Sequence, residues 1–134
     1  MYWRFSVMCI FKLFKKRKYV LSKEDQKWNK MWSLWTEGQV KSPYAELMTY
    51  QSEVYNGGHG QYFFYIGDNG DLWKEIAALD SILPKELTSC LHAAYKEFIA
   101  DKLSDEIIEQ CDNVFYEHEE EINTLLQEYA NKTY

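Results

Sequence analysis

The sequence predicts an all-α domain, a compact bundle of about five to six helices with a basic N-terminal arm. Apolar residues recur at three- and four-residue steps in several segments, which is the period of helices that bury one face. Capping residues, glycines and prolines separate these segments. The 134 residues suit one domain, and an aromatic fraction of 17% can fill its core without disulfides or metal.

Charge divides the chain into two parts. Residues 1–30 contain nine Lys or Arg and two Asp or Glu, a net charge of +7, whereas residues 31–134 contain six and nineteen, a net charge of −13. Such asymmetry is typical of a chain in which one segment binds polyanions and another resembles one. We expect an apolar and basic arm over residues 1–21 and the helical domain over residues 22–134.

The first two helices follow from their caps and glycines. Ser22 starts the first helix, with Asp25 at capping-box spacing, and Gly38 ends it. The second covers residues 44–55 and ends at Asn56-Gly57-Gly58, because Gly and Asn tolerate the left-handed conformation that closes a helix. The buried stripe of the first helix consists of Trp28, Met31, Trp32 and Trp35. That of the second consists of Leu47, Tyr50 (or Met48) and Val54.

The middle of the chain predicts three further helical segments. Residues 61–66 are too few for periodicity to separate strand from helix, and we expect helix because their neighbours are helical. Asp71 caps the next helix, and Pro84 fits the first turn of the one after it. The helix after Asp71 is expected to bury Leu72, Ile76 and Leu79. The helix after Pro84 is expected to bury Leu87, Cys90 (or Leu91), Ala94 (or Tyr95) and Phe98.

The last helix has the most regular apolar stripe in the sequence and is expected to run unbroken from its cap, Ser104, through Tyr129. Asp105 and Glu106 suit the positive end of its dipole. The stripe consists of Ile107, Ile108, Cys111, Val114, Phe115, His118, Ile122, Leu125, Leu126 and Tyr129. The opposite face carries Glu109, Asp112, Glu117, Glu119, Glu120, Glu121 and Glu128.

The residue pattern contains no recognisable catalytic or metal centre. Neither paired CxxC nor HExxH occurs, and Cys90 and His92 point to different sides of a helix. The glycine turn lacks the Lys-Ser/Thr of a phosphate loop. We expect His59 within it to be a surface or capping histidine and not a catalytic base. We expect no enzyme activity, no cofactor and no metal.

The compartment follows from the cysteines and the hydropathy. An odd number of cysteines without a spaced framework suits a reducing cytoplasm. No run is long enough to cross a bilayer, and the charge near the start follows the apolar stretch instead of preceding it as in a signal peptide. We expect a cytoplasmic protein. The three cysteines are Cys9, Cys90 and Cys111.

The acidic face of the last helix has two interpretations. It is either a solvated surface or a negative binding surface for a basic protein, since Arg and Lys pair with carboxylates through the donors that they use for DNA phosphates. In the second case we expect no direct DNA binding by the acidic body. The candidate partner-binding residues are Asp105, Glu109, Asp112, Glu117, Glu119, Glu120 and Glu121.

The basic arm has four interpretations. Residues 1–20 combine aromatic and basic side chains, and they could contact an anionic membrane surface or nucleic acid. They could also fold back on an acidic body, or form a mobile solubilising tail.

One short motif carries a family resemblance. Its residues are Asn56, Gly57, Gly58, Gln61, Tyr62 and Phe63, and Ala78-Leu79 on the next helix is also similar. The motif resembles the signature of a bacterial DNA-mimic protein family, a domain of otherwise largely unknown function, in which Asn-Gly-Gly ends a helix and Gln with aromatics follows. The resemblance covers roughly residues 28–98. His59-Gly60 departs from the family, which has a bulky apolar residue after the glycines.

The resemblance implies an all-helical fold, a homodimer, and an acidic surface that occupies the DNA-binding site of a helix-turn-helix regulator. We therefore predict a non-enzymatic acidic interaction protein that mimics DNA toward a basic DNA-binding protein. One alternative is an enzyme or small-ligand binder that uses the turn from Asn56 to Gln61, with a pocket lined by Asn56, His59, Gln61 and Tyr62. Another is a membrane-peripheral domain tethered by its arm.

Within the motif we expect structural roles. The Gln61 amide should bond free carbonyls at the helix end, and Tyr62, Phe63 and Phe64 should enter the core. A positive φ at Gly57 would make Gly57→Val destabilising.

Overall fold

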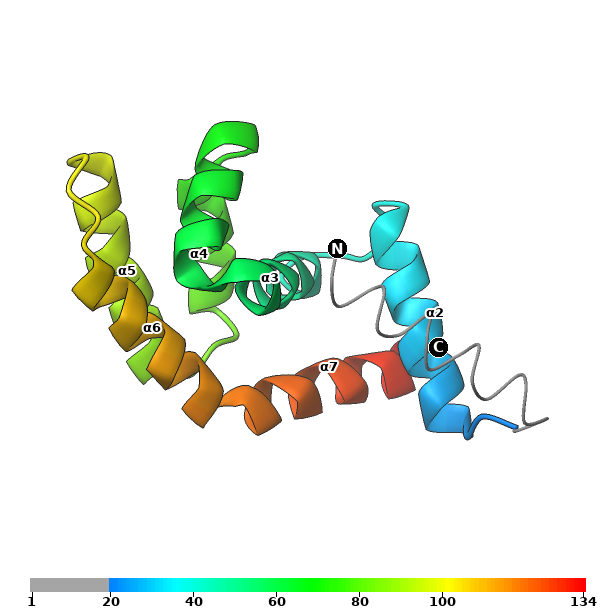
Figure 1. Ribbon diagram of the computed structural model, residues 1–134. Helices are drawn as coiled ribbons and strands as arrows, with labels where there is room; N and C mark the ends of the chain where they lie inside the picture. The colour runs from blue at the N-terminus through cyan, green and yellow to red at the C-terminus, as the bar shows by residue number, and fades with distance from the viewer. Residues whose placement is uncertain (1–19) are drawn as a thin grey trace.

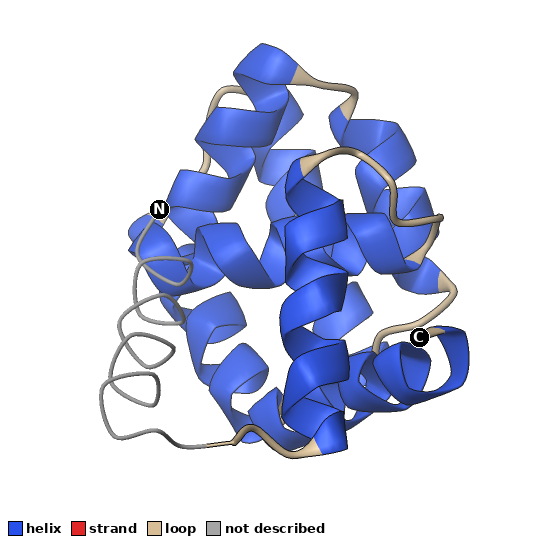
Figure 2. Cartoon of the chain, turned by 90° about the vertical axis from the view of Figure 1, so that its right-hand side faces the viewer, coloured by secondary structure: helices blue, strands red, loops and turns tan. Residues whose placement is uncertain are grey.

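The computed structural model describes residues 20–134, and within that range it contains six helices and no strand (Figure 1). The predicted all-α bundle is confirmed. The helices are α2 (Lys23–Thr36), α3 (Tyr44–Asn69), α4 (Leu72–Asp80), α5 (Lys85–Ile99), α6 (Asp105–Glu117) and α7 (Glu119–Thr133). Short loops connect them (Figure 2). The predicted arm, except for residues 20 and 21, lies outside the described residues.

The bundle is arranged around α3. This helix packs against α4, α6 and α7, while α5 packs mainly against α6 and α2 mainly against α7. Figure 1 shows α7 running along the lower edge of the molecule, from the end of α6 to α2. None of the described helices is both long and apolar enough to cross a membrane.

The start of α2 follows the predicted cap. The Ser22 Oγ accepts a hydrogen bond of 3.1 Å from the Asp25 N–H, which satisfies one free donor of the first turn. In the predicted stripe, Met31 and Trp32 are buried, and Trp28 and Trp35 are partly buried edge-on against Trp32.

The predicted end of the second helix is wrong. α3 continues past Asn56-Gly57-Gly58 to Asn69, and the two glycines form a kink inside it. The backbone leaves the helical region at Gly57 (φ −163°, ψ 21°) and Gly58 (φ 75°, ψ −171°), and then resumes the helix. Residues 61–66 are helical, as predicted, and the chain after the kink again buries one face, through Tyr62, Phe63 and Ile66. Phe63 packs on Phe98 of α5.

The two middle helices match their predictions. The Asp71 Oδ1 caps α4 by accepting from the Lys74 N–H at 3.2 Å, and Pro84 directly precedes α5. The predicted apolar positions of both helices face the interior. The buried residues there are Leu72, Ile76, Leu79, Leu87, Cys90, Leu91 and Ala94.

The predicted last helix is two helices. Ser104 caps α6 as expected, with its Oγ 3.3 Å from the Ile107 nitrogen, but the helix stops at Glu117. His118 leaves helical geometry (φ −107°, ψ 9°) and its N–H bonds back to Val114 and Phe115. The bend lets α6 lie on α5 while α7 reaches α2. Apolar spacing continues across the bend, so periodicity alone gave no sign of it.

Aromatic side chains fill the centre of the bundle. Tyr50, Tyr62, Phe63 and Phe115 are fully buried. The Tyr50 ring contacts Tyr62 and Phe115 edge-on, at centroid separations of 5.0 and 5.6 Å. These contacts join the two halves of α3 to α6, so the core holds the kink and the acidic helix together.

Removing the Phe115 ring should therefore weaken the whole domain. We expect Phe115→Ala to lower the free energy of unfolding by about 3–5 kcal/mol, because it leaves a cavity between α3 and α6. Its neighbour Tyr116 is 52% exposed, and Tyr116→Ala should cost less than about 1 kcal/mol. Urea unfolding followed by circular dichroism measures both values. Equal costs would contradict this account of the core.

Candidate functional site

The predicted partner-binding residues lie on two helices that meet at an angle (Figure 1). Asp105, Glu109 and Glu117 are exposed on α6, and Glu120 and Glu121 are exposed at the start of α7. The remaining two, Asp112 and Glu119, are partly buried. The single acidic helix face expected from the sequence is therefore divided by the bend at His118.

Three of these seven carboxylates bind neighbouring side chains. Asp112 binds His59, Glu119 accepts a 2.5 Å hydrogen bond from the Tyr55 hydroxyl, and Glu121 lies 3.0 Å from the His118 Nδ1. The other four make no side-chain hydrogen bond or ion pair within residues 20–134 and face solvent. They are Asp105, Glu109, Glu117 and Glu120.

The charge of this region is not neutralised by basic side chains of the described domain. Residues 103–131 contain nine Asp or Glu and no Lys or Arg. Every ion pair between residues in the range 20–134 involves a histidine, and none involves Lys or Arg. Within that range the surface of α6 and α7 therefore carries a negative field, screened mainly by solvent and salt.

The kink in α3 brings the backbone to Asp112. The His59 N–H donates a 2.8 Å hydrogen bond to the Asp112 Oδ1, and the His59 Nδ1 lies 2.6 Å from the same oxygen. Inside a regular helix the His59 N–H would point to a carbonyl one turn earlier. The kink frees that N–H for a carboxylate on α6.

Gly58 is required by both conformation and space. Its φ of 75° lies in the left-handed region, where a side chain is strained. A Cβ placed there would lie 2.9 Å from the Asp112 Oδ2. The condition set for Gly57, a positive φ, is not met, since its φ is −163°. A Cβ on Gly57 would nevertheless lie 2.8 Å from the Gln61 Cβ.

His59 is a core residue, and its expected place on the surface is wrong. Its side chain is fully buried, with the Nε2 2.6 Å from the Tyr50 hydroxyl and the Nδ1 on Asp112. Both ring nitrogens therefore have a polar partner inside the core. Burial raises the pKa of Tyr50, which keeps its hydroxyl protonated.

Two opposing effects act on the Asp112 carboxyl. Burial raises its pKa, but the hydrogen bonds from the side chain and backbone of His59 outweigh burial, and the pKa is lowered. The Tyr50–His59–Asp112 series has the order of a proton relay. Tyr50 and His59 are fully buried, however, and only Asp112 is partly exposed, at 31%. The relay fixes the kink and presents no nucleophile at the surface.

Gln61 acts across the kink in an unexpected way. Its side chain interacts with the carboxyl of Glu53, which belongs to the preceding half of α3, instead of a backbone carbonyl. Glu53 is only 4% exposed, and burial raises the pKa of its carboxyl although the interaction with Gln61 opposes that rise. Tyr62 and Phe63 enter the core as predicted, whereas Phe64 points outward and is 60% exposed. The Glu53–Gln61 pair could not be predicted, because Glu53 resembles any other helix carboxylate in the sequence.

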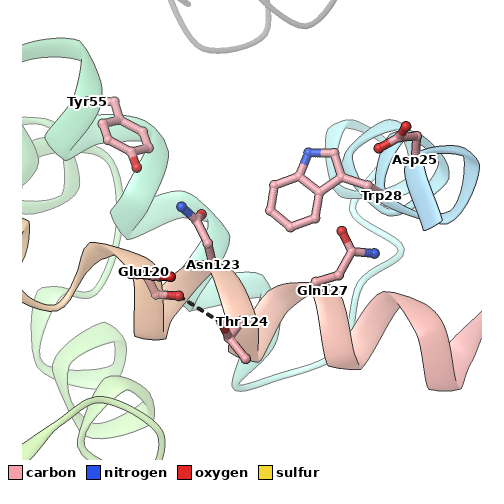
Figure 3. A pocket seen from close by; sticks show the side chains of 7 residues that line it. All are labelled: Asp25, Trp28, Tyr55, Glu120, Asn123, Thr124 and Gln127. Atoms are coloured by element: carbon pink, nitrogen blue, oxygen red, sulfur yellow. Dashed lines mark hydrogen bonds between the residues drawn. The ribbon is translucent and has the colours of Figure 1, made fainter. Parts of the chain in front are cut away.

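The small-ligand pocket considered for the turn is not assembled there. His59 and Tyr62 are fully buried, Asn56 is exposed, and Gln61 is committed to Glu53. A cavity of about 450 Å³ lies elsewhere, between α2, α3 and α7 (Figure 3). Its lining residues are Asp25, Trp28, Tyr55, Glu120, Asn123, Thr124 and Gln127.

The described cysteines and histidines do not gather into a metal site. Within residues 20–134, no group of three or more His, Cys, Asp or Glu is placed to hold a metal ion. Cys90 and Cys111 are both free and buried, and their thiols interact with each other. Burial raises the pKa of Cys111 to about 12, which disfavours the reactive thiolate at neutral pH. Cys9 lies outside the described residues.

A comparison of two glycines tests the contact at the kink. Gly58 and Gly38 both have positive φ, but a Cβ on Gly38 would meet no atom within 4 Å. Gly38→Ala should therefore cost only the strain of the left-handed conformation, about 1 kcal/mol. Gly58→Ala adds displacement of Asp112 and should cost about 2–4 kcal/mol. Equal losses in urea unfolding would show that the approach of Asp112 contributes little.

The lowered pKa of Asp112 predicts a specific loss of stability in acid. Its contribution is fully present above the ordinary pKa of an Asp, about 4, and is lost as the pH falls through the lowered folded-state value. The free energy of unfolding should be about 1–2 kcal/mol higher for the natural chain than for Asp112→Asn at pH 7. Urea titrations toward pH 2.5 should show this gap closing. Asp105→Asn, at an exposed and unpaired residue, should show no such convergence.

Comparisons with protein-family models, with curated proteins and with solved structures found no match to this chain. The resemblance to DNA-mimic proteins therefore remains a prediction from the residues of the glycine motif.

Proposed function

We propose that this protein is a non-enzymatic interaction protein whose acidic α6–α7 surface binds a basic DNA-binding protein, such as a transcription regulator, as a mimic of DNA. One observation carries the proposal. Nine carboxylates occur over residues 103–131 without a Lys or Arg, and within the described domain none of them pairs with one. A cationic partner would supply the missing counter-charge through the same donors that bind phosphate.

The arrangement of these charges supports a role in binding. Asp105 and Glu109 stand four residues apart on α6, a spacing at which like charges repel and destabilise a helix. Glu117 and Glu121 lie on either side of the bend at His118. Binding of a basic partner would relieve this repulsion, which gives the complex an electrostatic driving force that depends on salt.

Two other parts of the proposal, the DNA-binding nature of the partner and the homodimer, come from the resemblance. The cytoplasmic location is proposed from the cysteines and the hydropathy. The absence of enzymatic activity is likewise proposed, from the residue pattern. The described residues favour no specific alternative, since His59 and Tyr62 of the turn are fully buried and the arm considered for membrane contact lies almost entirely outside the described residues.

Capture from a native lysate tests the acidic surface. The immobilised full chain should retain a basic DNA-binding protein at low salt and release it as salt rises. Replacing three free carboxylates of α6, through Asp105→Asn, Glu109→Gln and Glu117→Gln, should raise the Kd at least about tenfold and flatten its salt dependence. Fluorescence anisotropy with the captured protein measures both quantities, and competition with labelled duplex DNA tests mimicry.

The matched control removes the same number of charges elsewhere. Glu24, Glu37 and Asp68 are exposed, lie outside residues 103–131 and have no side-chain ion pair in the described domain. Their Gln and Asn variants, combined in one chain, should leave the Kd within about threefold of the natural value. Capture of no basic protein, or equal weakening by the two triple variants, would reject the proposal.

A further inference from the structure

The cavity between α2, α3 and α7 lies beside the point at which the basic N-terminal arm joins the domain. α2 begins at Lys23, three residues after the first described residue, Val20. Its first two turns contribute Asp25 and Trp28 to the lining (Figure 3). One side of the cavity is formed by α7, from Glu120 to Gln127, and we refer to this cavity as the α2–α7 groove.

The chain between the arm and α2 is held at one end of this groove. The Gln26 amide donates a 2.9 Å hydrogen bond to the Leu21 carbonyl, which fixes the backbone directly before the helix. The Gln127 Nε2 donates to the Glu24 carbonyl at 3.2 Å, so a residue that lines the groove contacts the first turn of α2. Residues 21–24 therefore lie next to the Gln127 end of the groove.

The most basic part of the arm is close enough in sequence to reach along the groove. Residues 15–18 precede Val20 by two to five positions. An extended chain spans about 3.5 Å per residue, so this run has a reach of up to roughly 18 Å from Val20. Along α7, Glu120 precedes Gln127 by seven residues, which is about 10 Å at the helical rise. Both ends of the groove are thus within reach of residues 15–18 of the same chain.

The groove offers hydrogen-bond acceptors and negative charge. The hydroxyls of Tyr55 and Thr124 and the amide of Gln127 donate to other groups of the protein. The carboxylates of Asp25 and Glu120 take part in no ion pair within residues 20–134, and none of the lining residues is basic. A complementary segment would therefore bring positive charge and donors.

The arm supplies both over residues 12–18. These seven residues contain five Lys or Arg and no Asp or Glu. Residues 20–134 contain nine Lys or Arg, and none of these forms an ion pair with a carboxylate in that range. Because the basic segment is tethered beside the groove, its effective concentration there is on the order of millimolar, which favours it over a free ligand of similar charge.

We infer that the basic segment over residues 12–18, which lies outside the described residues, occupies the α2–α7 groove of its own chain, with Asp25 and Glu120 as its counter-charges. The inference goes beyond the proposed function, since it requires no partner. It makes the arm an internal counter-charge for the start of α7, which a basic protein has to displace where it approaches Glu120.

A spin label in the arm tests this placement. In the ¹⁵N-labelled full chain, Cys9→Ser and Leu13→Cys allow a nitroxide to be attached at position 13, within the basic segment and without loss of charge. The other two cysteines, Cys90 and Cys111, are buried. Mass spectrometry should find a single label on each chain.

The amide signals should report contact with α7 and not with α5. At low salt the nitroxide should broaden the signals of Asn123, Thr124 and Gln127. The signals of Ser89 and Ala93 should stay sharp, because α5 lies on the other side of the molecule from α2 (Figure 1). About 1 M salt should reduce the broadening at least about threefold, because the Debye length then falls to about 3 Å.

Two pairs of carboxylate variants locate the contact. Asp25→Asn with Glu120→Gln should reduce the broadening at least about threefold, because both counter-charges in the groove are lost. Glu24→Gln with Glu128→Gln removes two exposed charges of the same helices that do not line the groove. That pair should leave the broadening within about twofold of its original value.

An exchange of charges separates a specific contact from damage to the fold. Lys15→Glu with Lys16→Glu should abolish the broadening, and the further changes Asp25→Lys and Glu120→Lys should restore it. The dispersion of the amide signals shows whether each variant is folded.

Three results would overturn the inference. The first is the absence of broadening on α7, and the second is equal loss in the two pairs of carboxylate variants. The third comes from a mixture of nitroxide-labelled chain without ¹⁵N and ¹⁵N-labelled chain without nitroxide. Broadening in this mixture as strong as in the doubly labelled chain would place the arm on a second copy.

The outcomes also separate this inference from the proposed function. If the nitroxide broadens the α7 signals but no basic protein is captured from the lysate, the arm contact stands and the proposed function fails. If a basic protein is captured through the carboxylates of α6 but the α7 signals stay sharp, the proposed function stands and the arm contact fails.

Discussion

The Asp112 carboxylate joins the two parts of the molecule that matter most for its architecture. One oxygen accepts hydrogen bonds from both the backbone and the ring of His59, so α6 is attached to the kink of α3. The His59 ring is also hydrogen-bonded to the Tyr50 hydroxyl, and Tyr50 lies at the centre of the aromatic core. Core packing, the path of α3 and the position of the acidic helix are therefore coupled through one side chain.

The acidic residues of α6 and α7 fall into a structural group and a group that is free to bind a partner. Asp112 and Glu119 are partly buried and hold the protein's own groups, whereas Asp105, Glu109 and Glu117 are free in the described domain. Charge counting treats these residues alike, although only the free ones can bind a partner without disturbing the fold. The structural carboxylates fix the helices on which the free ones stand, so binding and stability depend on different members of one acidic set.

Helix identity was predictable because it depends on local signals. Ser22, Asp71 and Ser104 cap their helices through contacts three residues away, which a sequence shows directly. The kink and the bend were not predictable in this way. The residues Gly57-Gly58 are compatible with either a helix end or a kink, and the choice depends on Asp112, which lies 54 positions after Gly58. His118 interrupts the helix although the apolar spacing continues across it. The groove was missed for the same reason, since its residues come from three helices distant in sequence.

The close approach of Gly58 and Asp112 restricts which residues can replace either of them during evolution. A side chain at position 58 and a carboxylate at position 112 would occupy the same space, so each position limits what the other can become. In any descendant or relative with this kink, a change at one position should be accompanied by a change at the other. The distant pair Gly58 and Asp112, together with His59, which binds Asp112, would then be a better mark of common ancestry than the glycine motif alone, because a local turn can arise repeatedly.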